Sequence, residues 1–349
     1  MFRAAIIGGT GYGGAELCRQ LLHHPDVELC RVSAIDSVGK KLGDVHLNLA
    51  HVTDLRFEDL PPQEAAKGMD AVFLGLPHTV SCELAPKLLD SGAKVIDLSG
   101  DFRLRDAATY AKHYHHEHPH PELLGTFVYG LPELNRAAIR EADRIASPGC
   151  FATAIGLGLV PFARAGWLNS SVSTVACTGS SGSGAYASAS THHPVRAANL
   201  KAYKILGHQH PPEIEQTVRD AGAAQSFRLD FVPVSAPLVR GILATSLFEV
   251  PAETTADDVR RVLAEAFGDS PFIKLLEGRE PEVVAVAGTN YVELGFKLGD
   301  KDGARRPIAV ITAIDNLVKG GAGQAVQSMN IALGLAEDAG LVGYYGIWP

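Results

Sequence analysis

The chain has 349 residues, 46% of them hydrophobic and 20% charged, which is long enough for two globular domains and excludes a disordered or fibrous chain. Its formal net charge of −8 argues against a nucleic-acid partner, because such binding needs a broad basic field. No apolar run reaches about 18 residues, and the N-terminus lacks the plan of a signal peptide, so we expect no membrane segment. The five scattered cysteines form no CxxC pair, which argues against disulfides or a metal site and favours the cytoplasm.

The first part of the chain alternates between short apolar strands and helices. Strands are expected at 4–7, 27–35, 71–77 and 94–99, and helices at 15–24 and 81–91. This alternation predicts an α/β domain, with a parallel sheet covered by helices on both faces. The histidine-rich stretch 113–120 has prolines and irregular spacing, so we interpret it as a surface loop.

The pattern changes from about residue 172. Longer and often alternating strands are expected at 172–177, 227–234, 241–250 and 283–298, with a helix at 255–267. This predicts an α+β block with antiparallel strands. The chain returns to helix at 316–334, where Asp315 and Asn316 offer an N-terminal cap.

A glycine-rich turn separates the first strand from the first helix. Its spacing is G-x-T-G-x-x-G, and the helix N-terminus that follows supplies N–H donors for a pyrophosphate. The alternative is a tight strand–helix turn that binds nothing. The cofactor-binding residues predicted in this turn are Gly8, Thr10, Gly11, Tyr12, Gly13 and Gly14.

The end of the second strand lies where the ribose 2′ position is expected. Asp36 favours a free 2′-hydroxyl, as in NAD, whereas Ser33, Ser37 and Lys40 could hold the 2′-phosphate of NADP. These residues alone leave the choice of coenzyme open.

One cysteine has the setting of a nucleophile. Cys150 follows a proline–glycine turn and begins an apolar helix, and a helix N-terminus favours the reactive thiolate. The other four cysteines lie in apolar patterns typical of small core residues. The alternative for Cys150 is an ordinary buried cysteine.

A cysteine nucleophile needs a proton acceptor, and two histidines are candidates. His208 and His210 precede a helix, and imidazole titrates near neutral pH. Arg103, Arg196 and Arg240 are candidates for binding an anionic substrate, although an ordinary surface ion pair is the simpler interpretation of each.

Eight segments together resemble a known family. In chain order they are GGTGYGGAEL, FLGLPHTVS, VIDLSGDFRL, YGLPELNR, SPGCFATA, GHQHPPEIEQ, VRGILAT and DNLVKGGAGQAVQSMN. From residue 6 to the C-terminus, the chain resembles the N-acetyl-gamma-glutamyl-phosphate reductases of arginine biosynthesis.

The resemblance implies a Rossmann-type dinucleotide-binding domain and a second α+β domain, as in glyceraldehyde-phosphate and aspartate-semialdehyde dehydrogenases. The last helix would return to the first domain, which gives an NADP-binding domain of 1–147 and 317–349 and a catalytic and oligomerisation domain of 148–316. On the same basis Asn316 joins the cofactor-binding residues.

The implied activity is the NADPH-dependent reduction of N-acetyl-gamma-glutamyl phosphate to the semialdehyde, with phosphate released through a thioester on Cys150. His210 or His208 would move the proton, and Arg103, Arg196 and Arg240 would bind phosphate or carboxylate. The resemblance implies a homodimer or homotetramer acting on a small molecule.

Two departures from the family keep alternatives open. Tyr186 stands where the family often has an arginine, and 190–196 looks more like the branch that reduces carrier-linked aminoadipyl phosphate, which would add a carrier protein as partner. Ile35 and Asp36 replace the usual serine–arginine signal for NADP, although the family favours NADP. A different class of function is a non-catalytic NADP-sensing regulator. Cys150 and the paired histidines argue against it.

Overall fold

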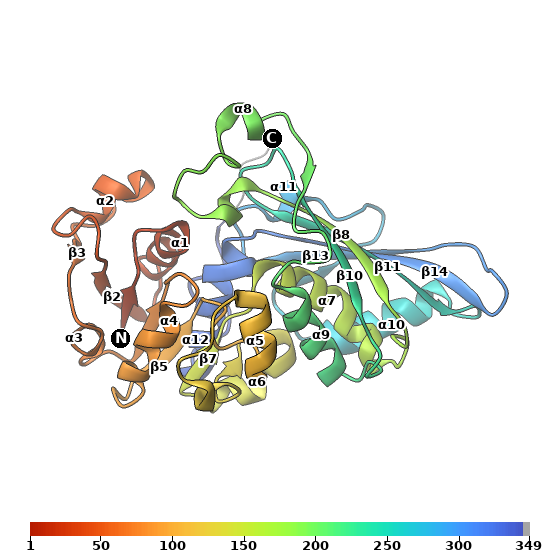
Figure 1. The fold of residues 1–349 in the computed structure, drawn as a ribbon, viewed down its shortest axis with the longest axis horizontal. Coiled ribbons are helices and arrows are strands. Elements are labelled where there is room, and N and C mark those ends of the chain that lie inside the picture. The colour runs from red at the N-terminus through yellow and green to blue at the C-terminus, as the bar shows by residue number, and fades with distance from the viewer. Residues whose placement is uncertain (345–349) are drawn as a thin grey trace. The chain divides into compact units, whose positions relative to one another are not determined.

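The computed structural model describes residues 1–344, which divide into two compact units. Unit 1 comprises residues 1–149 and 321–344, and unit 2 comprises residues 150–320. The chain therefore leaves unit 1 once and returns to it near its C-terminal end, as the colours of Figure 1 show. No helix among residues 1–344 is long and apolar enough to cross a membrane.

Unit 1 is built on a parallel sheet of seven strands in the order β3-β2-β1-β4-β5-β7-β6. The strands are β1 (Phe2–Ile7), β2 (Val27–Ser33), β3 (Phe57–Glu58), β4 (Ala71–Leu74), β5 (Lys94–Asp97), β6 (Val128–Tyr129) and β7 (Arg144–Ala146). The α-helices are α1 (Tyr12–Leu21), α2 (Leu42–Val45), α3 (Pro62–Ala66), α4 (Ser81–Leu84), α5 (Ala107–Tyr114), α6 (Pro132–Arg140) and α12 (Gly323–Ala332). The 3-10 turns are η1 (Leu47–Leu49), η2 (Ala85–Leu88) and η3 (Pro121–Leu123).

Two groups of helices contact this sheet. Helices α1, α6 and α12 pack together, and α12 also contacts β5. Helix α3 packs with η2 and contacts β1 and β2. All four residues of the central strand β4 are fully buried, because helices cover a parallel sheet on both faces.

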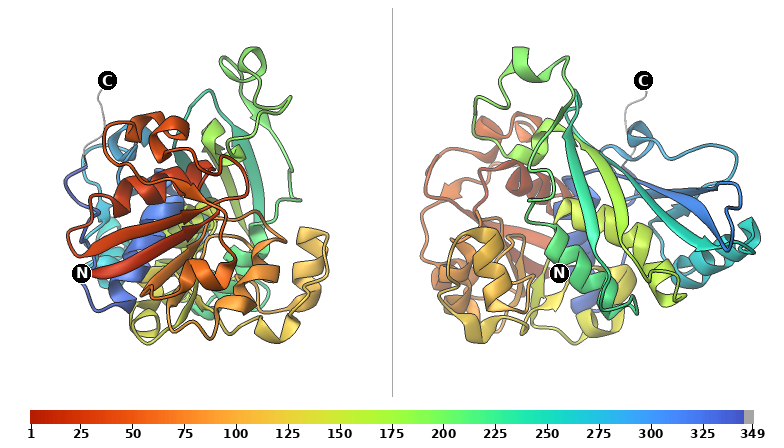
Figure 2. Two further views of the ribbon diagram at one scale, coloured as in Figure 1. Left: turned by 90° about the vertical axis from the view of Figure 1, so that its left-hand side faces the viewer. Right: turned by 45° about the vertical axis from the view of Figure 1, so that its right-hand side comes forward.

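Unit 2 contains a mixed sheet of seven strands in the order β12-β13-β14-β11-β8-β10-β9 (Figures 1 and 2). The strands are β8 (Val172–Thr178), β9 (Lys201–Ala202), β10 (Leu229–Ser235), β11 (Ile242–Pro251), β12 (Ile273–Leu275), β13 (Val292–Leu298) and β14 (Arg305–Ile314). The helices are α7 (Cys150–Arg164), α8 (His193–Arg196), α9 (Pro211–Asp220), α10 (Ala256–Phe267) and α11 (Val283–Val286), with the 3-10 turn η4 (Ser180–Ser183). A π-helical turn, η5 (Val318–Ala322), connects unit 2 to α12.

The two faces of the unit 2 sheet differ in burial. Helix α7 contacts β11 and β14, and it packs with α9 and α10. On the opposite face Val175 and Leu247 are 47% and 51% exposed. Val175 pairs with Val232 on one side and Thr245 on the other, and Leu247 pairs with Ser173, so this face exposes apolar side chains among small polar ones.

The structure confirms the strands expected at 4–7, 27–35, 71–77, 94–99, 172–177, 227–234 and 241–250, with somewhat different ends, and it corrects three other predictions. The strand expected at 283–298 is helix α11 followed by β13, because Gly288 adopts a φ of +78° and turns the chain between them. The helix expected at 81–91 is α4 followed by η2, since Pro86 has no N–H for an α-helical bond. Strand β14 was not predicted. The pairs β8–β10 and β12–β13 are parallel, so the second sheet is mixed and not wholly antiparallel.

The histidine-rich stretch is also less loop-like than expected. His113 lies in the last turn of α5, and His118 is only 6% exposed. The His118 ring packs edge-on against Phe102 and Tyr110. Among residues 1–344 the structure shows no group of three histidine, cysteine or carboxylate side chains placed to hold a metal.

Candidate active site

The glycine turn of unit 1 has the strand–turn–helix geometry that its spacing predicts. Gly8 has a φ of +91°, and a Cβ there would lie 2.6 Å from the carbonyl oxygen of Gly75. A Cβ on Gly14 would lie 2.4 Å from the oxygen of Gly9. In contrast, a Cβ on Gly11 or Gly13 would meet no atom within 4 Å. Backbone packing therefore requires glycine at positions 8 and 14. Gly11 and Gly13, in contrast, leave open space at the start of α1.

A histidine outside the motif supports this turn. The Nε2 atom of His46 lies 2.8 Å from the carbonyl oxygen of Gly9. His46 is 7% exposed, and its burial lowers the pKa of the ring. A neutral ring that donates from Nε2 satisfies the Gly9 carbonyl. Sequence reasoning missed His46, because it lies 37 residues from its partner and carries no local signal.

Polar side chains gather after β2, where the ribose is expected. The Thr10 hydroxyl donates a hydrogen bond of 2.8 Å to the Asp36 carboxylate, and both groups belong to unit 1. Ser33 is buried and its hydroxyl lies 3.4 Å from the oxygen of Leu60. Lys40 is exposed.

A second cation lies beside Lys40. Arg56 donates through Nη1 to the carbonyl oxygen of Gly39, at 2.6 Å, and it is exposed. Lys41, in contrast, forms an ion pair with Asp54. Arg56 was not predicted, because the short strand β3 that follows it had not been recognised.

Cys150 is the first residue of α7 and is half-buried. A Cβ on Gly320 would lie 2.7 Å from the Cys150 Cβ, so only glycine allows this approach. The following residue, Phe151, packs edge-on against His208 and His210, with ring centroids 5.5 and 5.9 Å away. Both histidines are thus held against the first turn of α7.

The two imidazoles have different surroundings. Their centroids are 4.7 Å apart, and the His208 Nδ1 accepts a 3.2 Å hydrogen bond from the backbone N–H of His210. Burial, with a smaller effect of the Lys204 charge, lowers the pKa of His208 to about 4. His208 is therefore neutral at neutral pH, with its proton on Nε2.

Tyr203 is a further aromatic neighbour that the sequence did not indicate. Its ring centroid lies 5.9 Å from that of His208. Burial raises the pKa of the Tyr203 phenol, and the charge of Cys150 raises it further. The phenol therefore stays protonated beside the cysteine.

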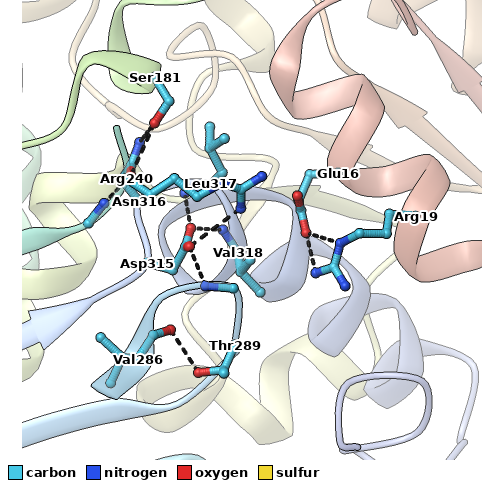
Figure 3. Close-up of polar contacts among 12 residues, drawn as sticks. Glu16, Arg19, Ser181, Arg240, Val286, Thr289, Asp315, Asn316, Leu317 and Val318 are labelled. Carbon is cyan, nitrogen blue, oxygen red and sulfur yellow. Dashed lines mark hydrogen bonds and ion pairs between the residues drawn. The ribbon is translucent and has the colours of Figure 1, made fainter. Parts of the chain in front are cut away.

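The two predicted arginines of unit 2 contact the ends of the sheet strands. Arg196 donates through Nη2 to the carbonyl oxygen of Thr178, at 2.9 Å, while its buried Nε has no hydrogen-bond partner. The Nη1 atom of Arg240 lies 3.4 Å from the carboxylate of Asp315, which is fully buried (Figure 3). The Arg240 side chain is 34% exposed.

Arg103 lies in unit 1 and is 6% exposed. Its Nε donates to the carbonyl oxygen of Ser147, and its Nη2 donates to that of Leu98, both at 2.8 Å. These contacts brace the chain where it leaves β5 and β7. Its predicted contact with substrate stays a prediction.

Asn316 is buried and contacts protein groups of unit 2. Its side chain donates to the Ser181 hydroxyl at 3.0 Å and accepts from the backbone N–H of Gly241 at 2.7 Å (Figure 3). The preceding Asp315 accepts from the N–H groups of Leu317 and Val318, as the expected cap does. The predicted role of Asn316 in cofactor binding stays a prediction.

Family models match both parts of the chain. Residues 3–142 match the semialdehyde dehydrogenase NAD-binding domain, and residues 150–316 match the semialdehyde dehydrogenase dimerisation domain. The fold resembles that of an aspartate semialdehyde dehydrogenase from Candida albicans solved with NADP, at a TM-score of 0.66 and 17% identity over 97% of this chain and 99% of that chain.

Two relatives cover almost all of the sequence. A protein of Thermomicrobium roseum named for the reduction of LysW-linked L-2-aminoadipate 6-phosphate is 45% identical, over 97% of this chain and 96% of its own. The N-acetyl-gamma-glutamyl-phosphate reductase of Methanopyrus kandleri is 42% identical, over 98% of each chain.

Proposed function

Because the chain belongs to the family of N-acetyl-gamma-glutamyl-phosphate reductases and LysW-linked aminoadipate phosphate reductases, we propose that it reduces N-acetyl-gamma-glutamyl phosphate to the semialdehyde and releases phosphate. The observation that carries this proposal is Cys150 at the first position of α7, with two buried histidines packed on the adjacent Phe151. This arrangement provides a nucleophile and a proton carrier in the same unit.

The covalent steps belong to Cys150. Its thiolate, which the N-terminus of α7 favours, attacks the acyl carbon, so that a C–S bond forms and the C–O bond to phosphate breaks. The nicotinamide cofactor, when bound, supplies the hydride that reduces the resulting thioester. Collapse of the thiohemiacetal then breaks the C–S bond, restores the thiolate and releases the aldehyde.

Of the two histidines, we assign the proton transfer to His210. A pKa of about 4 leaves His208 too weak a base to hold a proton at neutral pH, and its Nδ1 already accepts the N–H of His210. His208 therefore orients the His210 backbone and presents an Nε2–H. Arg240 and Arg196 provide positive charge at the strand ends of the same unit, and Arg103 is the third candidate for anion binding.

Unit 1 fits a dinucleotide, and we assign NADP to it. The turn leaves room over Gly11 and Gly13 for a pyrophosphate, with Thr10, Tyr12 and the N–H groups of α1 beside it. Lys40 and Arg56 place two cations after β2, where a 2′-phosphate would need them. The Asp36 carboxylate opposes that phosphate, so the expected preference for NADP over NAD is modest.

A second candidate substrate is the same acyl phosphate attached to a carrier protein. The 45% identical relative is named for such a substrate. In addition, the arm 184–207 contains Arg196, Lys201 and Lys204 and no acidic residue, although the whole chain has a net charge of −8. Such a basic arm suits an acidic carrier.

Unit 2 matches a dimerisation domain, and its sheet exposes Val175 and Leu247. We assign this face, around Val175 and Leu247, to a homodimer contact, with a homotetramer as the larger alternative. We also propose that the protein acts in the cytoplasm, where five scattered cysteines with no CxxC spacing stay reduced.

Steady-state kinetics with three substrates test the proposal. N-acetylglutamyl phosphate is compared with carrier-linked glutamyl and aminoadipyl phosphates at matched concentrations, with NADPH oxidation as the readout. We expect the N-acetylated substrate to be reduced most efficiently. Reduction of the carrier-linked substrates alone would refute the main proposal and favour the carrier-linked substrate.

If the substrate is carrier-linked, the double variant Lys201→Glu/Lys204→Glu should lower the efficiency of the reaction with the carrier-linked substrates only.

A further inference from the structure

The carboxylate of Asp315, at the end of β14, is fully buried and surrounded by donors from three segments of unit 2 (Figure 3). Its Oδ1 accepts the N–H groups of Leu317 and Val318, at 2.8 and 2.9 Å. Its Oδ2 accepts the N–H of Gly288 at 2.7 Å and faces the Nη1 of Arg240 at 3.4 Å. A buried carboxylate needs such partners, and three of these four are backbone groups.

The same short segment also reaches Cys150. The Asp315 carbonyl oxygen accepts the N–H of Gly320 at 2.9 Å. Gly320 in turn packs so closely against Cys150 that a Cβ on it would overlap the Cys150 Cβ. Asn316, the next residue, binds the N–H of Gly241. Consecutive residues of one turn therefore fix both Arg240 and the residue after it, while the same turn supports the nucleophile.

From these contacts we propose that Asp315 is a positioning residue for the anionic substrate and that it acts by holding the Arg240 guanidinium. The proposal rests on the proposed function. A free arginine samples many rotamers, and fixing it before the substrate arrives lowers the cost of binding. The Arg240 side chain is 34% exposed, whereas that of Asp315 is fully buried. Within this ion pair it is therefore the guanidinium that is accessible to a substrate from solvent.

Two variants of Asp315 separate this role from capping alone. Asp315→Asn keeps an oxygen for the Leu317 and Val318 N–H groups and removes the charge. Asp315→Ser keeps a helix-capping hydroxyl that is too short to reach Arg240. The matched control is Glu293→Gln, because Glu293 is a buried carboxylate of the same unit whose ion-pair partner is Arg279.

We expect either Asp315 variant to raise the KM for the acyl phosphate by roughly 3- to 10-fold, which corresponds to one side chain that must now be ordered on binding. The coenzyme KM and the alkylation rate of Cys150 should stay at the wild-type values. Combined with Arg240→Met, the Asp315 substitution should cause no further rise, since the two residues act as a unit. Glu293→Gln should lower the melting temperature without changing this KM.

The proposal is overturned if the KM for the acyl phosphate is unchanged, or if it rises equally with and without Arg240. It is also overturned if neither Asp315 variant folds while Arg240→Met does, because the carboxylate would then serve the fold alone. A wild-type enzyme that reduces no acyl phosphate would instead refute the proposed function, and the positioning role with it.

Discussion

The two histidines beside Cys150 differ in their hydrogen bonds, although the local sequence makes them look alike. His208 and His210 lie on one turn and contact the same phenylalanine. The sequence left open which of them transfers the proton, because both are histidines that lie just before the same helix. Both rings are buried, and the structure distinguishes them by the His210 N–H that the His208 Nδ1 accepts, a contact that is not visible in the local sequence.

Removal of the thiol tests its role directly. Cys150→Ala should lower kcat by at least about 10³-fold, because no thioester can form. Coenzyme affinity should remain, since the dinucleotide turn lies in the other unit. Titration with coenzyme and steady-state kinetics of the same preparation provide both numbers. Cys177→Ala, which changes a half-buried cysteine of β8, is the matched control and should stay active. Substantial activity of Cys150→Ala would exclude the thioester route.

The pKa of His208 predicts a loss of stability in acid. Its folded-state pKa of about 4 lies below the ordinary 6.5, so the unfolded chain binds the proton more tightly. Its contribution to stability is complete above about pH 6.5 and is lost as the pH falls toward 4. Near pH 5 the protein should be about 2 kcal/mol less stable from this group than near pH 7.

The comparison for this prediction uses two asparagine variants. His208→Asn keeps an acceptor for the His210 N–H. In this variant the free energy of unfolding, measured with urea, should fall less between pH 7 and pH 5 than in the wild type. His193→Asn, at an exposed position in α8, should leave that fall unchanged. An identical fall in wild type and His208→Asn would show that the buried imidazole does not cause the loss. His210→Asn should instead reduce kcat.

The coenzyme prediction concerns one carboxylate and two cations. Asp36→Ser should raise kcat/KM for NADP about fivefold, because like charges a few Å apart in water cost about 1 kcal/mol. Lys40→Ala and Arg56→Ala should lower efficiency with NADP and not with NAD. Lys41→Ala is the control, since Lys41 is paired with Asp54. Better use of NAD than of NADP by the wild type would show that Asp36 decides the specificity.

At the scale of elements, the sequence predicts best those features that local patterns encode. The apolar runs of β1 and β4 and the glycine turn after β1 are such features, and so is the helix that begins at Cys150. The strand expected at 283–298 fails because its valine-rich start forms α11 when Gly288 turns the chain. The contacts of His46 and Asp315 join segments far apart in the sequence, and no local pattern could reveal them.

Two glycines of α1 separate the packing role of the turn from its binding role. Gly14→Ala should cost about 1–3 kcal/mol of stability, because the new Cβ would overlap the Gly9 carbonyl oxygen. Gly13→Ala meets open space and should not lower stability, but it should raise the coenzyme Kd about tenfold by blocking the approach of the pyrophosphate. Thermal unfolding and calorimetric titration provide the two readouts. Wild-type affinity in Gly13→Ala would place the pyrophosphate elsewhere.

At the scale of the whole molecule, the proposed function assigns cofactor binding to one unit and the covalent steps to the other. Unit 1 matches an NAD-binding domain and contains the glycine turn, whereas Cys150, both histidines, Arg196 and Arg240 all belong to unit 2. The family of the chain, its fold and its class as an acyl-phosphate reductase agree with the resemblance carried by the eight sequence segments. Those segments could not specify the group on the substrate nitrogen, because both branches of the family share the same chemistry at the cysteine.

The most direct test of the central claim is a rapid-mixing measurement of phosphate release in the absence of NADPH. N-acetylglutamyl phosphate is mixed with the reduced enzyme, and released phosphate and intact protein mass are followed together. We predict a burst of about one phosphate per chain, with an acyl adduct on Cys150 that NADPH then discharges as the semialdehyde. The account would be contradicted if the enzyme oxidised NADPH with this substrate but showed neither a phosphate burst nor an acyl adduct, and if Cys150→Ala were fully active.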